Sequence, residues 1–285
     1  LRINYNILIY REGVFFMFFI RSNDNAKIAV YELNPEGIKT IVLVHGWPLS
    51  HKMFEYQFPS LLHCGYRIVS IDLRGFGNSD VTSDGYNYNQ FATDLYFVIY
   101  ALNLSNFDLL GFSMGGAIVT RYMQLYRGYG VRKLCLCDAA VPSYCKSINN
   151  PYGQTIESTN KLINLGYNDR PALNEYFGSI FFYKQHSNAF KNWMQNLNNS
   201  ASGLGEMGSL IALRDENVFN DLKNIHVQTG IFHGKEDKIC PFGMAKIMHD
   251  NINNSIIFPF EKAGHGAFYD VKDTFNKTLI EFLND

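Results

Sequence analysis

A regular alternation between short apolar runs rich in β-branched residues and longer segments of helical spacing is the feature that most constrains how this sequence folds. Thr40–Val44 is one of these runs, and continuous runs of this kind form strands that are buried on both faces of a sheet. Strands that alternate with helices pair in parallel and have helices packed against both faces. The sequence therefore predicts an α/β fold with a mostly parallel, doubly wound sheet.

The individual elements can be placed along the chain from the same spacing. The predicted strands cover residues 18–21, 27–32, 40–44, 66–73, 107–110, 131–137, 228–233 and 255–260. The predicted helices cover residues 51–64, 89–102, 114–126, 241–250 and 271–283. Pro59 lies inside the first of these helices. Because proline interrupts a helix, we expect a kink or two short helices there.

The alternation of strands and helices stops between residues 143 and 224. This segment contains helix formers and many aromatic residues but no clear strand pattern, so we interpret it as a helical cap inserted over one end of the sheet. Residues 17–142 and 225–285 then form the core. A length of 285 residues corresponds to one large domain with such an insertion, and no flexible linker divides it.

The first sixteen residues do not follow the pattern of the core. The apolar run Val14–Ile20 is too short to span a bilayer, and no small-residue cleavage pattern follows it as in a secretory signal. One hypothesis is that residues 1–16 are a non-native leader and that Met17 is the natural start. The codons for Arg11–Val14 can form a purine-rich stretch that resembles a bacterial ribosome-binding site. The alternative is an additional edge strand.

Charge and cysteine content exclude several classes of protein. The chain has 25 Lys and Arg residues and 26 Asp and Glu residues, with a formal net charge of −1, which argues against a nucleic acid or a membrane as its partner. Its five cysteines are scattered and odd in number, so we expect no disulfide framework and a cytoplasmic location. Cys135 and Cys137 alternate along a predicted buried strand, which indicates core residues rather than metal ligands.

The strongest chemical motif is Gly111-Phe-Ser113-Met-Gly115, which lies between a predicted strand and a predicted helix. A G-x-S-x-G sequence is common, but this context is typical of a tight turn that presents a nucleophilic serine above the end of a sheet. The N-terminus of the following helix favours the negative charge that develops there. Ser113 is therefore the candidate nucleophile.

A serine hydroxyl requires a general base, and a histidine base requires a carboxylate to orient it. Of the eight histidines, His265 lies on a loop after the last predicted strand, at the edge of the sheet where this architecture binds ligands. Asp237 follows the preceding strand and is the candidate acid, whereas His233 is expected to shape the turn that carries it. Asp138, at the end of another predicted strand, is the alternative acid or else a cap or turn residue.

Two backbone N–H groups must stabilise the oxyanion of a tetrahedral intermediate. Met114 is expected to supply one of them, because it follows the nucleophile. Trp47 is expected to supply the other from the turn that begins at His45 and Gly46, and Pro48 has no N–H to donate. The alternative is that Trp47 is only a packing aromatic.

The order of these motifs resembles the α/β-hydrolase superfamily, and within it the cofactor-free haloperoxidase (non-heme chloroperoxidase) and arylesterase group. The motifs that carry the resemblance are His45-Gly-Trp-Pro-Leu-Ser50, Asp72-x-Arg-Gly-x-Gly-x-Ser79, Gly111-Phe-Ser-Met-Gly-Gly116, His233-Gly-x-x-Asp237 and Gly264-His265-Gly266. The resemblance covers about residues 17–285. It implies an α/β-hydrolase fold and a serine esterase that uses no heme, metal or other cofactor. It also implies a perhydrolase side activity, in which a peracid made from a short carboxylic acid and hydrogen peroxide oxidises halide. Members of the group often have proline directly before the catalytic histidine, whereas this chain has Gly264.

The sequence therefore predicts a serine carboxylesterase that acts on small or aryl esters through an acyl-enzyme, with Ser113, Asp237 and His265 as the triad. Two alternatives stay open: a carbon–carbon bond hydrolase with the same triad, and a non-catalytic ligand receptor on the same fold. The expected partner is a small-molecule ester, and the sequence does not decide between a monomer and a homo-oligomer. Aromatic residues of the cap are expected to line the pocket in part, and the candidates are Tyr144, Tyr152, Tyr176, Phe177, Phe181, Phe182, Tyr183, Phe190 and Trp193.

Overall fold

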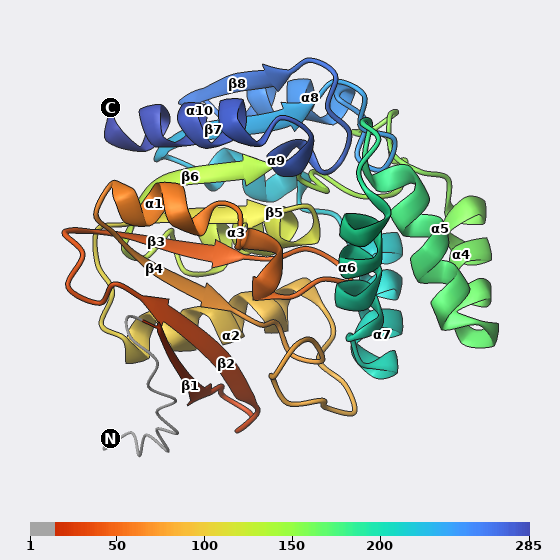
Figure 1. Cartoon of the computed structure of the whole chain (residues 1–285), viewed down its shortest axis with the longest axis horizontal. Helices are drawn as coiled ribbons and strands as arrows, with labels where there is room; N and C mark the ends of the chain where they lie inside the picture. Colours follow the sequence, from red (N-terminus) through yellow and green to blue (C-terminus); the bar gives the residue numbers. More distant parts are fainter. Residues whose placement is uncertain (1–14) are drawn as a thin grey trace.

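The computed structural model describes residues 15–285 (Figure 1). The hypothesis of a leader over residues 1–16 therefore lies, except for its last two residues, outside the described residues. Phe15 and Phe16 belong to strand β1 (Phe15–Arg21), which pairs in antiparallel register with β2 (Lys27–Leu33). The edge strand thus begins before Met17.

Within residues 15–285, eight strands form one sheet in the order β1-β2-β4-β3-β5-β6-β7-β8. The remaining strands are β3 (Lys39–Val44), β4 (Tyr66–Ile71), β5 (Phe107–Phe112), β6 (Val131–Cys137), β7 (Gln228–Gly234) and β8 (Ser255–Phe260). Strands β3 to β8 pair in parallel, whereas β2 pairs in antiparallel register with both β1 and β4. The predicted mostly parallel sheet is therefore confirmed.

The direction in which strands are added reverses at β3, because β4 pairs on one side of it and β5 on the other. In open α/β sheets, ligands bind in the crevice at the carboxyl ends of the strands where this reversal occurs. A ligand site is therefore expected at the loops that follow β3 and β5.

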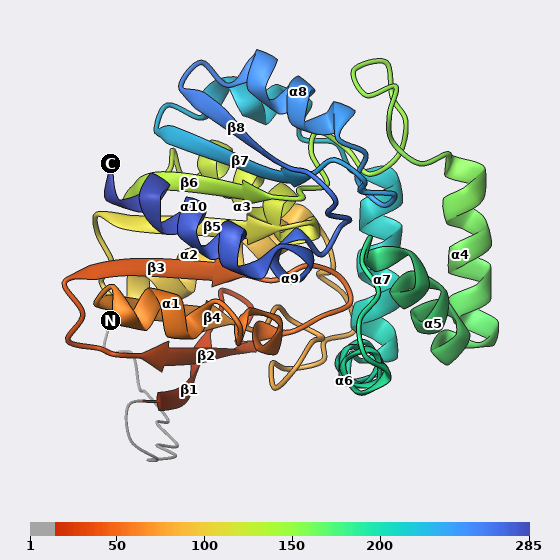
Figure 2. The same ribbon diagram turned by 45° about the horizontal axis from the view of Figure 1, so that its top comes forward.

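Helices cover both faces of the sheet (Figures 1 and 2). On one face lie α1 (Phe58–His63), α9 (Ala267–Asp270) and α10 (Lys272–Asn284), and on the other lie α2 (Tyr88–Ala101), α3 (Met114–Leu125) and α8 (Gly243–Asn251). The predicted helix over residues 51–64 is divided as expected, into a short 3-10 helix, His51–Phe54, and α1, although the break lies at residues 55–57 and Pro59 is in the first turn of α1. The predicted final helix over residues 271–283 corresponds to α10, and a separate short helix, α9, precedes it.

Four helices lie beyond the carboxyl ends of the parallel strands, and we call them the cap helices (Figure 2). They are α4 (Ile156–Asn168), α5 (Arg170–Phe181), α6 (Asn188–Asn199) and α7 (Gly203–Asp215). A short 3-10 helix, Phe219–Asn224, leads from them back to β7. The cap helices therefore cover the edge of the sheet at which the strand order reverses.

Helix α3 approaches the sheet closely enough to require glycine at the contact. A Cβ atom at Gly115 would lie 2.4 Å from the carbonyl oxygen of Val44 and 2.5 Å from that of His45. A Cβ atom at Gly111 would lie 2.5 Å from the carbonyl oxygen of Gly115. These glycines allow the start of α3 to sit directly against the ends of β3 and β5.

We expect Gly115→Ala to lower the free energy of unfolding by about 1–3 kcal/mol, because the added methyl group must separate α3 from the backbone of β3. Gly203 is the matched control, since it is an exposed helical glycine with no atom within 4 Å of an added Cβ. Gly203→Ala should leave stability unchanged or raise it by up to about 1 kcal/mol. Chemical denaturation of both variants measures the difference, and equal effects would contradict the close-packing argument.

Candidate active site

Ser113 occupies a strained turn between β5 and α3. Its backbone has φ of 53° and ψ of −118°, a conformation that costs a residue other than glycine about 1–3 kcal/mol. The backbone around it holds the turn in place: Ser113 N donates to Cys137 O at 2.9 Å, and Ser113 O accepts from Ala140 N at 3.0 Å. The hydroxyl is thereby presented beyond the end of the sheet, where the sequence analysis placed it.

The structure brings Ser113, His265 and Asp237 together in one chain of hydrogen bonds. His265 Nε2 lies 2.9 Å from Ser113 Oγ, and His265 Nδ1 lies 2.8 Å from Asp237 Oδ2. All three residues are buried. Because a carboxylate accepts hydrogen bonds, Nδ1 carries the imidazole proton and Nε2 is free to accept the proton of the serine hydroxyl.

The loop after β7 orients the Asp237 carboxylate. Oδ1 of Asp237 accepts from the backbone N–H groups of Ile239 at 2.8 Å and Cys240 at 2.9 Å. These two bonds leave Oδ2 directed at His265. The arrangement can fix the tautomer of the imidazole and stabilise its protonated form.

Asp138, the alternative acid, has a different role in the structure. Its Oδ1 accepts from Gly234 N at 2.8 Å, at the start of the loop that carries Asp237. Burial and the neighbouring Asp237 raise the pKa of the Asp138 carboxyl well above its ordinary value. Asp138 is therefore a buried turn residue behind Asp237, while Asp237 holds the hydrogen bond to His265.

His233 also lies behind the carboxylate, as its predicted place in the turn suggests. Its Nε2 donates to Cys240 O at 2.7 Å, and burial lowers the pKa of the ring. Asp138, His233 and Asp237 are the one group in the described part of the chain whose donor atoms lie close enough together to hold a metal ion. Hydrogen bonds within the protein use His233 Nε2 and both carboxylate oxygens of Asp237, and these bonds support the acid.

The loop after β3 places Trp47 next to the serine. Among residues 15–285, neither the backbone N–H of Trp47 nor that of Met114 has a hydrogen-bond partner within the protein. The Trp47 ring is also packed, because its Nε1 donates to Glu206 O at 2.8 Å and the ring forms a T-shaped pair with Phe177. Trp47 therefore combines a buried side chain with a backbone donor that is available to a ligand.

His45 anchors this turn from inside the protein. Its Nδ1 donates to Gly46 O at 2.8 Å, and its Nε2 accepts from Leu73 N at 2.9 Å. Burial lowers the pKa of His45 to about 4, so the ring is neutral at ordinary pH. From the sequence, His45 was expected only to turn the chain; the signal for more was a polar side chain directly after the apolar run Ile41–Val44.

A narrow apolar cavity adjoins Ser113. Its free volume is about 20 Å³, which is room for roughly one water molecule. The residues that line it are Trp47, Ser113, Tyr144, Leu162, Leu173, Tyr176, Phe177, Ile180, Leu210, Leu213 and Ile239. Of the aromatic cap residues considered from the sequence, Tyr144, Tyr176 and Phe177 reach this cavity. Tyr176 is also 47% exposed, so its side chain extends from this cavity to the solvent.

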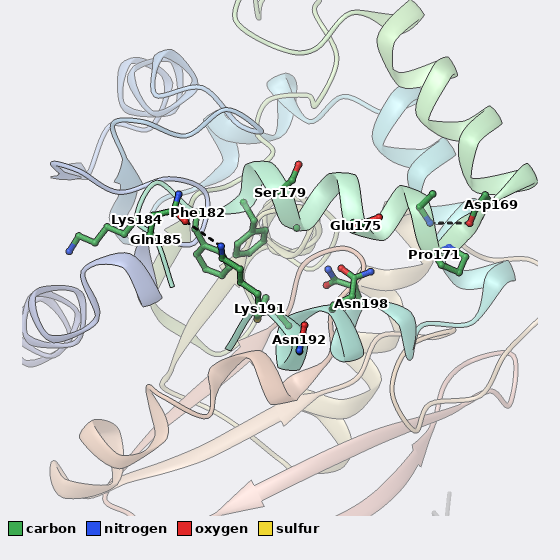
Figure 3. Close-up of a pocket in the computed structure, with 15 residues that line it drawn as sticks. Asp169, Pro171, Glu175, Ser179, Phe182, Lys184, Gln185, Lys191, Asn192 and Asn198 are labelled. Carbon is green, nitrogen blue, oxygen red and sulfur yellow. Dashed lines mark hydrogen bonds between the residues drawn. The ribbon is translucent and has the colours of Figure 1, made fainter. Parts of the chain in front are cut away.

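A larger cavity of about 640 Å³ lies between α5 and α6, and Figure 3 shows the side chains that face it. Its lining mixes polar and apolar side chains and includes Glu175, Lys191 and Asn198. Phe181 forms part of its inner wall and packs edge-on against the His265 ring at 5.3 Å between ring centroids. None of the three residues of the hydrogen-bonded chain lines this second cavity.

Asp270 is a buried acid near the site that the sequence analysis did not identify. Its Oδ2 accepts from Gly264 N at 2.8 Å, directly before His265. The signal was available, because an acid five residues after the candidate base ends the mostly apolar stretch Ala267–Asp270. A carboxylate in such a place must have hydrogen-bond donors around it.

Comparison with known proteins agrees with the fold and with the resemblance described above. Residues 39–271 match the family described as alpha/beta hydrolase fold. The chain is 44% identical over 246 residues to the AB hydrolase superfamily protein YisY of Bacillus subtilis (strain 168), covering 86% of this chain and 92% of that protein.

Two solved structures are also similar to this chain in fold and in sequence. The esterase EaEST from Exiguobacterium antarcticum has a TM-score of 0.92 and 42% identity, covering 94% of this chain and 99% of that one. The bromoperoxidase from Bacillus anthracis has a TM-score of 0.89 and 32% identity, covering 94% of this chain and 100% of that one. The protein is therefore an enzyme of the α/β-hydrolase fold family, related to its esterase and haloperoxidase group.

Proposed function

We propose that this enzyme is a serine carboxylesterase that hydrolyses small, uncharged esters, including aryl esters, through an acyl-enzyme on Ser113. The observation that carries the proposal is the chain of hydrogen bonds from Asp237 through His265 to Ser113 beside an apolar cavity. Its similarity to an esterase of the same fold supports the same reaction class.

The geometry supports a two-stage reaction. His265 Nε2 takes the hydroxyl proton as Ser113 Oγ attacks the ester carbonyl, and the N–H groups of Trp47 and Met114 hold the oxyanion. His265 then returns the proton to the leaving alcohol, which departs and leaves the acyl-enzyme. A water molecule, deprotonated by His265, attacks the acyl group and releases the acid. Asp237 stabilises the imidazolium in both stages.

The cavity indicates the class of acyl group. No lysine or arginine is among the residues that line it. A carboxylate placed there would lose its hydration without gaining a partner, which costs several kcal/mol. This observation favours an uncharged acyl group over the anionic ring-cleavage product that a carbon–carbon bond hydrolase of this fold would bind.

A second activity is favoured by the similarity to a bromoperoxidase. In this reaction, hydrogen peroxide replaces water in the second stage and attacks the acyl-enzyme, which releases a peracid and regenerates Ser113. The free peracid then oxidises bromide: peracid, bromide and a proton give the carboxylic acid and hypobromous acid. The same triad serves both stages, and the halide reacts outside the cavity.

We expect Ser113→Ala to lower kcat/KM for an aryl acetate by about 10⁴-fold or more. The variant should also lose labelling by a fluorophosphonate probe and peroxide-dependent bromination in acetate buffer, because all three require Oγ. Steady-state kinetics and mass spectrometry of the labelled protein measure these losses. Retention of most of the esterase activity by a folded variant would contradict the acyl-enzyme mechanism, and retention of bromination alone would separate the second activity from the site.

A matched pair of substrates tests the uncharged acyl cavity. We expect kcat/KM for an aryl butyrate to exceed that for the aryl hemisuccinate of the same chain length by about 100-fold, because the second carboxylate must be desolvated. A dienoate ring-cleavage product, followed by its loss of absorbance, should be turned over more slowly than the butyrate. Equal rates for the pair, or preference for the dienoate, would favour the carbon–carbon bond hydrolase.

His45 should make stability depend on pH. Its pKa is about 4 in the folded protein and near 6.5 in the unfolded chain, so the unfolded chain binds more protons between these values. The stabilising effect of the neutral ring is complete above about pH 6.5 and is lost as the pH falls towards 4, by about 3 kcal/mol in total. Denaturation across this range should show a shallower slope for His45→Asn than for the wild type. Identical slopes would contradict the assignment.

A further inference from the structure

We infer that Asp270 is a positioning residue for His265, which it holds by fastening the His265 loop to the end of α5 and to the connection between α5 and α6 (residues 182–187). This role rests on the proposed function, because it concerns the geometry of the proposed base. Asp270 lies in α9, outside the chain of hydrogen bonds that reaches Ser113.

The Asp270 carboxylate is fully buried and accepts four hydrogen bonds. Oδ2 accepts from Gly264 N and from Tyr183 N, each at 2.8 Å. Oδ1 accepts from Lys184 N at 3.1 Å and from His186 Nε2 at 2.9 Å. One side chain therefore joins the residue before His265 to three donors of the α5–α6 connection.

The residue after His265 is attached to the same part of the cap. Gly266 N donates to Phe181 O at 3.0 Å, at the last residue of α5. The Phe181 ring packs edge-on against the imidazole itself. The backbone on both sides of His265 is thus held by the segment that runs from the end of α5 into the connection.

The identity of residue 264 as glycine accounts for the use of the Asp270 carboxylate to restrain the His265 loop. A proline at this position would restrict the loop by its ring but could not donate a hydrogen bond. In this chain, a Cβ atom at Gly264 would lie 2.8 Å from Tyr183 N and 3.0 Å from Phe181 O, so the connection leaves no room for a side chain. Glycine permits this close approach, and its N–H supplies the bond to Asp270 that restrains the loop.

Aromatic packing fixes the position of His186, which donates to the Asp270 carboxylate. The His186 ring contacts Phe182 and Phe190 with centroids 4.6 and 4.8 Å apart, and Phe190 also packs against Tyr269, the neighbour of Asp270. These contacts orient His186 Nε2 towards the carboxylate. Because none of these residues lines the cavity at Ser113, we expect them to affect His265 rather than the binding of the acyl group.

Asp270→Asn tests the role without changing side-chain size. Each oxygen of the Asp270 carboxylate accepts hydrogen bonds from two N–H groups. In either orientation of the asparagine amide, its NH₂ group therefore faces two other donors. Donors repel one another, so the loop must shift. We expect kcat for an aryl acetate and the rate of fluorophosphonate labelling to fall about 10–100-fold, since small displacements of a reacting group cost this much. KM should change by less than about twofold, because the cavity lining is untouched.

Asp108→Asn is the matched control, because Asp108 is a buried carboxylate paired with Arg132 at 2.6 Å. It lies five residues before Ser113, about 16 Å away along an extended strand. Thermal denaturation of both variants separates stability from positioning. A folded Asp270→Asn variant with the kcat and labelling rate of Asp108→Asn would overturn the inference.

His186 provides a second test that does not depend on whether Asp270→Asn folds. We expect His186→Ala to lower kcat by about threefold to tenfold and His186→Gln to restore it, because the glutamine Nε2 can donate to the same carboxylate. Equal kcat values for His186→Ala and the wild type would also overturn the role. Failure of the wild type to label would instead overturn the proposed function on which the role rests.

Discussion

The close approach of α3 to the ends of β3 and β5 is the constraint on which the rest of the site depends. Gly111 and Gly115 remove the side chains that would hold the helix away, and the turn between β5 and α3 then puts Ser113 into a strained conformation at the point where the strand order reverses. The helix N-terminus and the loop after β3 come together at the same place. A strained nucleophile and unpaired N–H groups are thus products of one packing contact.

Around this contact, the buried polar side chains are oriented by the hydrogen bonds that their burial requires. Asp237 is directed at His265 because two backbone N–H groups occupy its other oxygen, and the buried ring of His45 is neutral and holds the turn that leads to Trp47. Asp270 accepts donors from two separate parts of the chain, so it couples the His265 loop to the cap. In each case a buried polar side chain is satisfied by backbone groups, which makes its orientation specific.

Much of the core could be predicted because its signals are local. Continuous β-branched runs indicated the parallel strands, Pro59 indicated a divided helix, and the tight turn at Ser113 followed from small residues between a strand and a helix. The edge strand was longer than predicted, since Phe15 and Phe16 pair with β2 although their sequence has no regular alternation. The boundaries of the cap at residues 143 and 224 stay a prediction, because helical spacing there shows no sharp limit.

The sequence by itself determined the class of fold, the order of the candidate nucleophile, acid and base, and the positions of the strand ends from which they project. These properties are encoded in spacing and in residue type over short distances. Only the tertiary structure decided that Tyr176 and Phe177 line the cavity while Phe190 packs against the core, and that Asp270 joins Gly264 to His186. Such contacts join residues far apart along the chain and depend on how the cap helices dock on the sheet, which no local periodicity records.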